Sequence, residues 1–127
     1  MQIKRSLGIL ATALTVSALA AGAYDFARGY ATTWQSDNLT SIRYTISSNV
    51  GSGSPDLHCD IRTPSGYVVP MNGGASAWHD GQSESTFNYA PSGGGERGRY
   101  TATCYWHIEN SGGLNGNHAV TSVSFYR

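Results

Sequence analysis

Residues 99–109, RYTATCYWHIE, decide the fold of this chain. Apolar and polar side chains alternate through the whole stretch, so that five residues share one face, namely Tyr100, Ala102, Cys104, Trp106 and Ile108. Successive side chains of a β-strand point to opposite faces, and an alternation of this kind is typical of a strand with one buried face. The stretch therefore predicts a strand whose Cys104 points into the core.

Residues 57–62, LHCDIR, show the same alternation around the only other cysteine, Cys59. Leu57, Cys59 and Ile61 are predicted to face inward. Two cysteines allow a single intramolecular pairing, and in an exported domain we expect them to form a disulfide. Closing a loop of 45 residues by a Cys59–Cys104 bridge is worth roughly 4 kcal/mol in the chain-entropy model.

The residues between the inward-facing ones must face solvent, and they are polar. They are His58, Asp60 and Arg62 around Cys59, and Arg99, Thr103, Tyr105, His107 and Glu109 around Cys104. These side chains form one patch if the two strands are neighbours in a sheet, and two separate patches if the bridge joins opposing sheets. We expect opposing sheets, because bridges between sheets are the familiar arrangement in sandwiches.

The first 23 residues carry the pattern of a secretory signal peptide. Lys4 and Arg5 precede an uncharged, apolar stretch at residues 7–21, and small residues at 21–23 provide a cleavage site before Tyr24. The apolar stretch is short for a membrane span, which needs about 20 residues. We therefore predict a signal peptide at 1–23 and a single exported domain at 24–127, with 18–20 as a second candidate cleavage site.

The charge of residues 24–127 excludes two classes of partner. This part of the chain has six arginines, no lysine and eight acidic residues, so its formal net charge is −2. Nucleic acids and anionic membrane surfaces are bound through clustered basic side chains, which are missing here. No segment after the signal peptide is long and apolar enough to span a membrane.

The rest of the domain also follows the two-residue period of strands rather than the period of helices. Further strands are predicted at 30–34, 39–48, 67–69, 75–79, 83–89 and 118–126. Turn residues separate them, including Asn72-Gly73-Gly74 and Asp80-Gly81, of which the second is a strong hairpin signal. The expected fold is all-β, a single small β-sandwich of about seven or eight short antiparallel strands with one disulfide.

The sandwich is immunoglobulin-like only in the broad sense. Antibody-type domains place a tyrosine two residues before the second cysteine, where this chain has Ala102. They also bury a tryptophan that follows the first cysteine, but Trp78 lies 19 residues after Cys59.

Catalysis would have to use the outward-facing His58, Asp60, His107 and Glu109, with Arg62 or Arg99 to stabilise an anion. Two histidines, a carboxylate and an arginine could cleave a phosphodiester by acid–base chemistry. No nucleophile elbow, zinc-protease motif or phosphate loop accompanies them. A polar face on two exposed strands explains the same residues, so we predict a protein that is not an enzyme.

No cofactor or metal site is predicted. The four histidines lack the spacing of zinc ligands, and no Cys-x-x-Cys motif occurs. Asp56, Asp60, Asp80 and Glu84 could in principle ligate calcium, but residues 80–84 do not match an EF-hand loop. Turn formation accounts for these aspartates more simply.

Aromatic side chains beside Asn, Ser and Gly favour a binding function. Tyr and Trp recognise polar partners, because each joins a large apolar surface to a hydrogen-bonding group. We predict a secreted recognition domain that binds an extracellular or envelope protein or a carbohydrate. The candidate binding residues are Tyr105, His107, Trp34 and Trp78.

Two alternatives remain open. The first is a self-assembling surface or fibre subunit that associates through its last strand, whose residues 119–126 loosely resemble the terminal strand of chaperone–usher pilins, with its penultimate tyrosine. In that family the second cysteine normally lies in the middle of the chain, whereas Cys104 lies near the end of this one. The second alternative is a small secreted hydrolase using His107 and Glu109.

Overall fold

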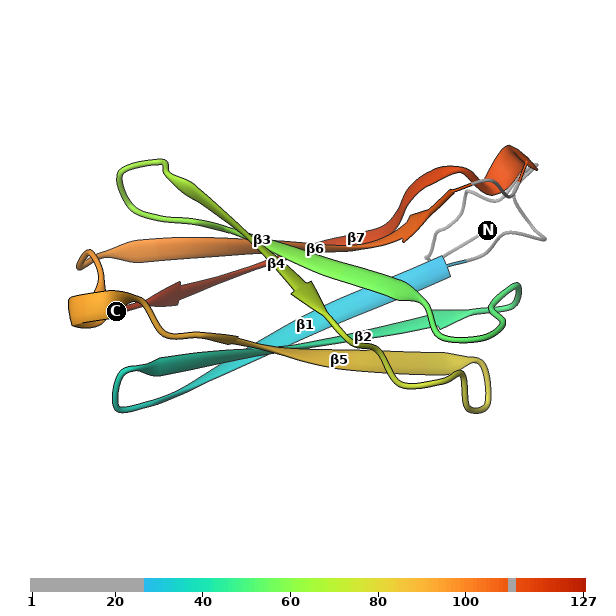
Figure 1. Cartoon of the computed structure of the whole chain (residues 1–127), viewed down its shortest axis with the longest axis horizontal. Coiled ribbons are helices and arrows are strands. Elements are labelled where there is room, and N and C mark those ends of the chain that lie inside the picture. The colour runs from blue at the N-terminus through green and yellow to red at the C-terminus, as the bar shows by residue number, and fades with distance from the viewer. Residues whose placement is uncertain (1–26, 110–111) are drawn as a thin grey trace, which may run out of the picture.

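A computed structural model describes residues 27–109 and 112–127, so the predicted signal peptide lies outside the described part of the chain. Seven strands form two antiparallel sheets (Figure 1). The strands are β1 (Ala27–Ser36), β2 (Leu39–Ser48), β3 (Asp56–Arg62), β4 (Val68–Gly73), β5 (Gln82–Tyr89), β6 (Arg99–Ile108) and β7 (Gly116–Tyr126). The all-β sandwich with one disulfide is confirmed. No helix among the described residues is long and apolar enough to cross a membrane.

The sheets have the strand orders β1-β2-β5 and β4-β3-β6-β7. Their inner faces make one core, because each strand turns its apolar set toward the opposing sheet. The core side chains are Ile42, Tyr44, Ile46, Leu57, Cys59, Ile61, Phe87, Tyr89, Tyr100, Ala102, Cys104, Trp106 and Phe125. The inward-facing residues predicted around both cysteines are confirmed as buried, apart from Ile108, which is half-buried at the end of β6.

The disulfide joins Cys59 and Cys104, as the cysteine count predicts, but the expectation that it connects opposing sheets is wrong. β3 and β6 are neighbours in the four-stranded sheet, and the two cysteines lie directly opposite each other with Cα atoms 3.9 Å apart. Alternation along a strand shows that both side chains point inward, but it carries no information on which strands are adjacent. The polar residues on the other face of these strands therefore form one surface.

Two strand predictions between β3 and β5 need correction. The turn expected at Asn72-Gly73 is part of β4, where Gly73 fits under the ring of Phe87. The strand expected at 75–79 is an irregular segment that is joined to β5 by an isolated bridge between His79 and Gln82. The hairpin at Asp80-Gly81 is confirmed, and both residues have positive φ, as a tight hairpin turn requires.

The C-terminal strand is an edge strand, yet β1 covers its edge. The buried hydroxyl of Tyr44 donates a hydrogen bond to the carbonyl of Ala119 at 2.5 Å, and the amide of Gln35 donates to the carbonyl of Tyr126. Ala119 has positive φ at an irregularity in the β6–β7 pairing, and its carbonyl accepts the hydrogen bond from Tyr44 of β2. The edge proposed for self-association thus already has contacts within the molecule at both ends.

Candidate binding face

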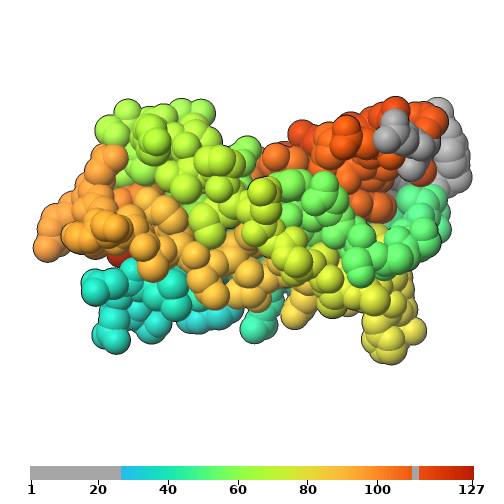
Figure 2. All heavy atoms as spheres, in the orientation of Figure 1, coloured from blue at the N-terminus to red at the C-terminus, as the bar shows by residue number. Residues whose placement is uncertain are grey.

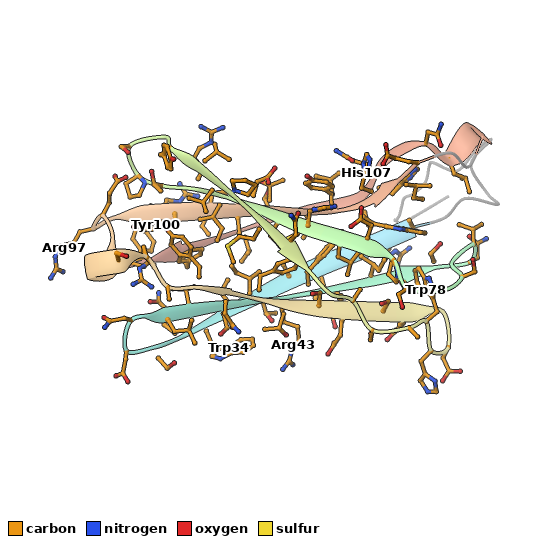
Figure 3. The ribbon with its side chains drawn as sticks, in the orientation of Figure 1. Trp34, Arg43, Trp78, Arg97, Tyr100 and His107 are labelled. Carbon is orange, nitrogen blue, oxygen red and sulfur yellow. A yellow bond between two sulfur atoms is a disulfide. The ribbon has the colours of Figure 1, made fainter. Side chains whose placement is uncertain are left out.

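The outer surface of the four-stranded sheet carries a group of ring and amide side chains that lie close together. We call it the His–Tyr face and define it by His58, Asn72, Tyr105, His107 and Asn117, with the carboxylates of Asp56, Asp60 and Glu109 around it. Figure 3 shows His107 projecting outward from this sheet, away from the core.

Strand register brings these residues together. His58 on β3 lies opposite Tyr105 on β6 and opposite Asn72 on β4. One row further along, His107 on β6 lies opposite Asp56 on β3 and opposite Asn117 on β7. Side chains directly opposite on one face of an antiparallel pair lie close enough to interact, so four strands contribute to a continuous surface.

The ring of His58 contacts the rings of both Tyr105 and His107. His58 stacks on Tyr105 with ring centroids 5.2 Å apart and an angle of 21° between their planes. The ring of His107 meets His58 edge-on, with centroids 6.3 Å apart. The stack fixes the rings of His58 and Tyr105 relative to each other on the outer side of the sheet.

Each histidine lies between an asparagine and a carboxylate. His58 has Nδ1 at 2.5 Å from Asn72 Oδ1 and Nε2 at 3.0 Å from Asp56 Oδ1. His107 repeats the pattern, with Nδ1 at 2.7 Å from Asn117 Oδ1.

The carboxylate partner of His107 is Glu109, with Oε2 at 3.7 Å from Nε2. The Nδ1 atoms of both rings lie within hydrogen-bond distance of an asparagine oxygen, and these contacts orient the rings. The contact between His107 and Glu109 is longer than a hydrogen bond.

Tyr105 supplies a neutral phenol. Burial raises its pKa, and the nearby carboxylates of Asp60 and Asp56 raise it further. A phenol that stays protonated can donate and accept hydrogen bonds, so Tyr105 adds both functions to a surface otherwise rich in acceptors.

A small hollow borders the face beside His107. Its volume is about 260 Å³, and its wall includes Asp56, Trp106, Glu109 and Leu114, with loop residues 50–55 on the other side. Pockets that enclose a whole small molecule have volumes of roughly 300–1,000 Å³. This hollow can therefore take part of a ligand whose remainder lies on the face.

Both arginines considered as anion-stabilising groups are engaged away from the histidines. Arg62 donates to the carbonyl of Gly66 at 3.0 Å, and Arg99 donates to Ser124 Oγ at 3.1 Å. The charged groups nearest to His58 and His107 are carboxylates. The electrostatics of the face therefore disfavour a phosphate group, which needs positive charge around it.

The four candidate binding residues do not gather in one place. Tyr105 and His107 lie on the His–Tyr face, but Trp34 lies on the outer surface of the other sheet (Figure 3), where the guanidinium of Arg43 is 5.2 Å from its ring centroid. Trp78 is half-buried at one end of the core and packs edge-on against Trp106, with centroids 5.3 Å apart. It also covers Gly51, where any Cβ atom would overlap its ring.

Asn72 and Asn117 were not among the candidate residues. The glycines that follow Asn72 favour a turn, and Asn117 lies just before the strand predicted at 118–126. The alternating pattern around Asn72 and Pro70, and around Asn117 and Ala119, covers too few residues to reveal a strand. The roles of both asparagines also depend on partner residues in other strands.

Within residues 27–109 and 112–127 no three His, Cys, Asp or Glu side chains are placed to hold a metal ion. Of the carboxylates considered for calcium, Asp56 and Asp60 lie on β3, whereas Glu84 lies on β5 and Asp80 in the turn before it. Comparisons with family models, with curated proteins and with solved structures found no match for this chain.

Proposed function

We propose that this protein is a secreted recognition domain that binds a carbohydrate through the His–Tyr face. The observation that carries the proposal is the pair of neighbouring histidines, each held between an asparagine and a carboxylate. The disulfide supports a site of action in an oxidising compartment, where such bonds persist.

Sugar hydroxyl groups each need a donor and an acceptor, and the face offers both at fixed positions. The rings of His58 and His107, the phenol of Tyr105 and two side-chain amides lie within a few rows of one sheet. Polar groups held in place lose little conformational freedom when they bind, which lowers the cost of association. A protein interface would instead be centred on several buried aromatic or arginine anchors, whereas Tyr105 is the one such residue among the five described residues that define the face.

A glycan array tests the proposal, with the purified parent protein compared with Tyr105→Ala and His107→Ala. We expect binding to a restricted set of glycans and a loss of at least tenfold in each variant. Trp34→Ala changes an exposed aromatic residue on the opposite surface and should bind like the parent. Loss of binding only in Trp34→Ala would move the site to the three-stranded sheet.

A pull-down from extracellular material separates carbohydrate from protein partners. Capture that survives enzymatic removal of glycans, and that needs Tyr105 and His107, would replace the carbohydrate by a protein partner at the same face. Failure of both screens would refute a recognition role for this face.

A hydrolase is the second candidate, because the distance between the histidines permits it. Ring centroids 6.3 Å apart let one imidazole act as an acid and the other as a base on a single substrate. The carboxylates around them make a neutral glycosidic substrate more favourable than a phosphodiester. A glycosidase and nuclease panel with His58→Ala and His107→Ala decides the question, and no activity in the parent protein excludes it.

A further inference from the structure

The side of the sandwich opposite the β1–β7 contact remains open. Its two edge strands are β4 and β5, which belong to different sheets, and Figure 1 looks into this side. A groove of about 550 Å³ lies between β4 and the end of β5, with Val69 and Met71 of β4, Asn88 and Tyr89 of β5 and Pro91 in its walls and Tyr100 beneath. Thr86 lies on the same edge of β5, just before the groove. Figure 2 shows β4 above β5 and the loop that follows it.

The β5 edge offers free backbone hydrogen bonds. Glu84 exchanges hydrogen bonds with Ser76, because its N–H donates to Ser76 Oγ and its carbonyl accepts from the Ser76 N–H. The backbone of Glu84 therefore points away from β2. Backbone groups in an antiparallel strand alternate in direction, so Thr86 and Asn88 point the same way.

Only the first half of this edge has a partner. The segment from Gly74 to Ser76 lies along β5, where Ser85 Oγ donates to the carbonyl of Gly74 at 2.8 Å. Up to Gly73 the chain belongs to β4, which is a strand of the other sheet. Among the described residues, no backbone group from another segment reaches the outward N–H and C=O groups of Thr86 and Asn88.

The facing edge of β4 is less receptive. Cys59 and Cys104 have the short Cα separation of a pair without direct backbone hydrogen bonds, 3.9 Å, so the backbone of Cys59 points toward β4 and pairs with Met71. The next residue, Pro70, then points outward, and it has no N–H to donate. Proline on an edge strand is a common device against unwanted pairing, and β5 has none.

We propose that the groove takes an extended peptide segment of a partner protein, which adds to the β1-β2-β5 sheet as a fourth strand at Thr86–Asn88. Peptides that add to a sheet edge gain affinity from backbone hydrogen bonds and specificity from pockets for alternate side chains. The apolar walls formed by Val69, Met71 and Tyr89 accept aliphatic residues at every second position of the peptide.

Charge complementarity adds a basic residue to the expected peptide. Glu96 is the one charged side chain among the groove-lining residues of the described chain. Its carboxylate accepts two hydrogen bonds from Ser65, at 3.0 Å from the backbone N–H and 2.7 Å from Oγ. These bonds lower its pKa, so that Glu96 stays an anion facing the peptide. Lysine or arginine at the corresponding end of the peptide completes the match.

A displayed library of random linear heptapeptides, selected on the purified protein, tests this inference. We expect enriched peptides with aliphatic residues at alternate positions and a lysine or arginine at one end. Thr86→Pro removes one outward N–H without touching the hydrogen bonds to β2, and it should weaken the selected peptides at least tenfold. Thr86→Ala loses the same side chain but keeps the N–H, so it should bind like the parent.

Two measurements keep the test decisive. If Thr86→Pro fails to fold, Val69→Glu places a charge in the apolar wall and should cause the same loss. Hydrogen exchange should show the Thr86 and Asn88 amides exchanging fast in the free protein and protected by a selected peptide. The inference would be overturned if the selection enriched no peptides. It would also be overturned if the selected peptides bound Thr86→Pro and Val69→Glu as tightly as they bind the parent.

The Thr86 and Asn88 amides could instead become more protected from hydrogen exchange as the protein concentration rises, with no peptide present. That result would assign the edge to a second copy of this chain. Selected peptides should bind unchanged to Tyr105→Ala and His107→Ala, because the His–Tyr face lies on the outside of the other sheet. The inference on the groove and the proposal of carbohydrate binding therefore stand or fall separately.

Discussion

The two lateral sides of the sandwich contrast in how they manage their edge strands. On the β1–β7 side, hydrogen bonds from Tyr44 and Gln35 to carbonyl groups of β7 hold the sheets together. On the β4–β5 side, a groove separates the strands and only the first half of β5 is covered. We expect the closed β1–β7 side to contribute more to the stability of the fold, and the open β4–β5 side to be accessible to a binding partner. Four predictions test this comparison.

The largest expected effect belongs to neither side. Cys59 and Cys104 lie in the central strand pair, and replacing both by alanine should lower the free energy of unfolding by about 4 kcal/mol. Urea unfolding of the double variant measures the loss, and the reduced parent protein is its control. Hydrogen exchange should rise on both sides alike, and a rise confined to the open side would contradict this symmetry.

Arg127 should have the next largest effect, because its guanidinium joins three segments at one end of the sandwich. It donates to the carbonyls of Gly94 and Asn38, both at 3.1 Å, and to Thr40 Oγ1 at 2.8 Å. Charge-assisted hydrogen bonds of this kind contribute more than neutral ones, so Arg127→Met should cost about 3 kcal/mol. Arg97→Met, at an exposed loop position, is the matched control and should stay within about 0.5 kcal/mol in thermal unfolding.

Substitutions of two glycines, one on each side of the sandwich, allow the two sides to be compared directly. A Cβ atom on Gly29 would lie 2.8 Å from the carbonyl oxygen of Ala119 and 2.9 Å from the ring of Tyr44, so Gly29→Ala should cost about 2 kcal/mol. Gly74, between β4 and β5, has nothing within 4 Å of such an atom. Gly74→Ala should therefore leave the unfolding midpoint in urea nearly unchanged, and equal losses at both positions would refute the contrast.

Tyr44→Phe should have the smallest effect at neutral pH, about 1 kcal/mol, because Thr121 Oγ1 still donates to the carbonyl of Ala119. Burial raises the pKa of Tyr44 far above its ordinary value. The unfolded chain releases this proton near pH 10 while the folded protein keeps it, so the contribution of Tyr44 to stability is complete below about pH 10 and falls above it.

The difference in stability between parent and variant should thus fall by about 1.4 kcal/mol for each pH unit above 10, so that it reaches zero below pH 11 and the variant is then the more stable protein. Unfolding in urea at pH 7 and at several values up to pH 11 measures the change. A difference that stays constant over this range would mean that Tyr44 ionises alike in the folded and unfolded states.

The sequence by itself determined the strands around the two cysteines, the direction of their side chains and the pairing of Cys59 with Cys104. These features follow from a local rule, because alternation has a period of two residues and needs no knowledge of other strands. The same rule correctly placed Tyr105 and His107 outward. It could not recognise Asn72 as part of a strand, since glycines and a proline interrupt the pattern in β4.

Tertiary structure alone decided which strands are neighbours. The order β4-β3-β6-β7 places His58 beside His107 and makes one polar face instead of two. It also closes the β1–β7 side and leaves the β4–β5 side open. Strand order depends on how all the apolar faces pack together, which is a property of long-range contacts, so the candidate site and the groove exist only in the folded arrangement.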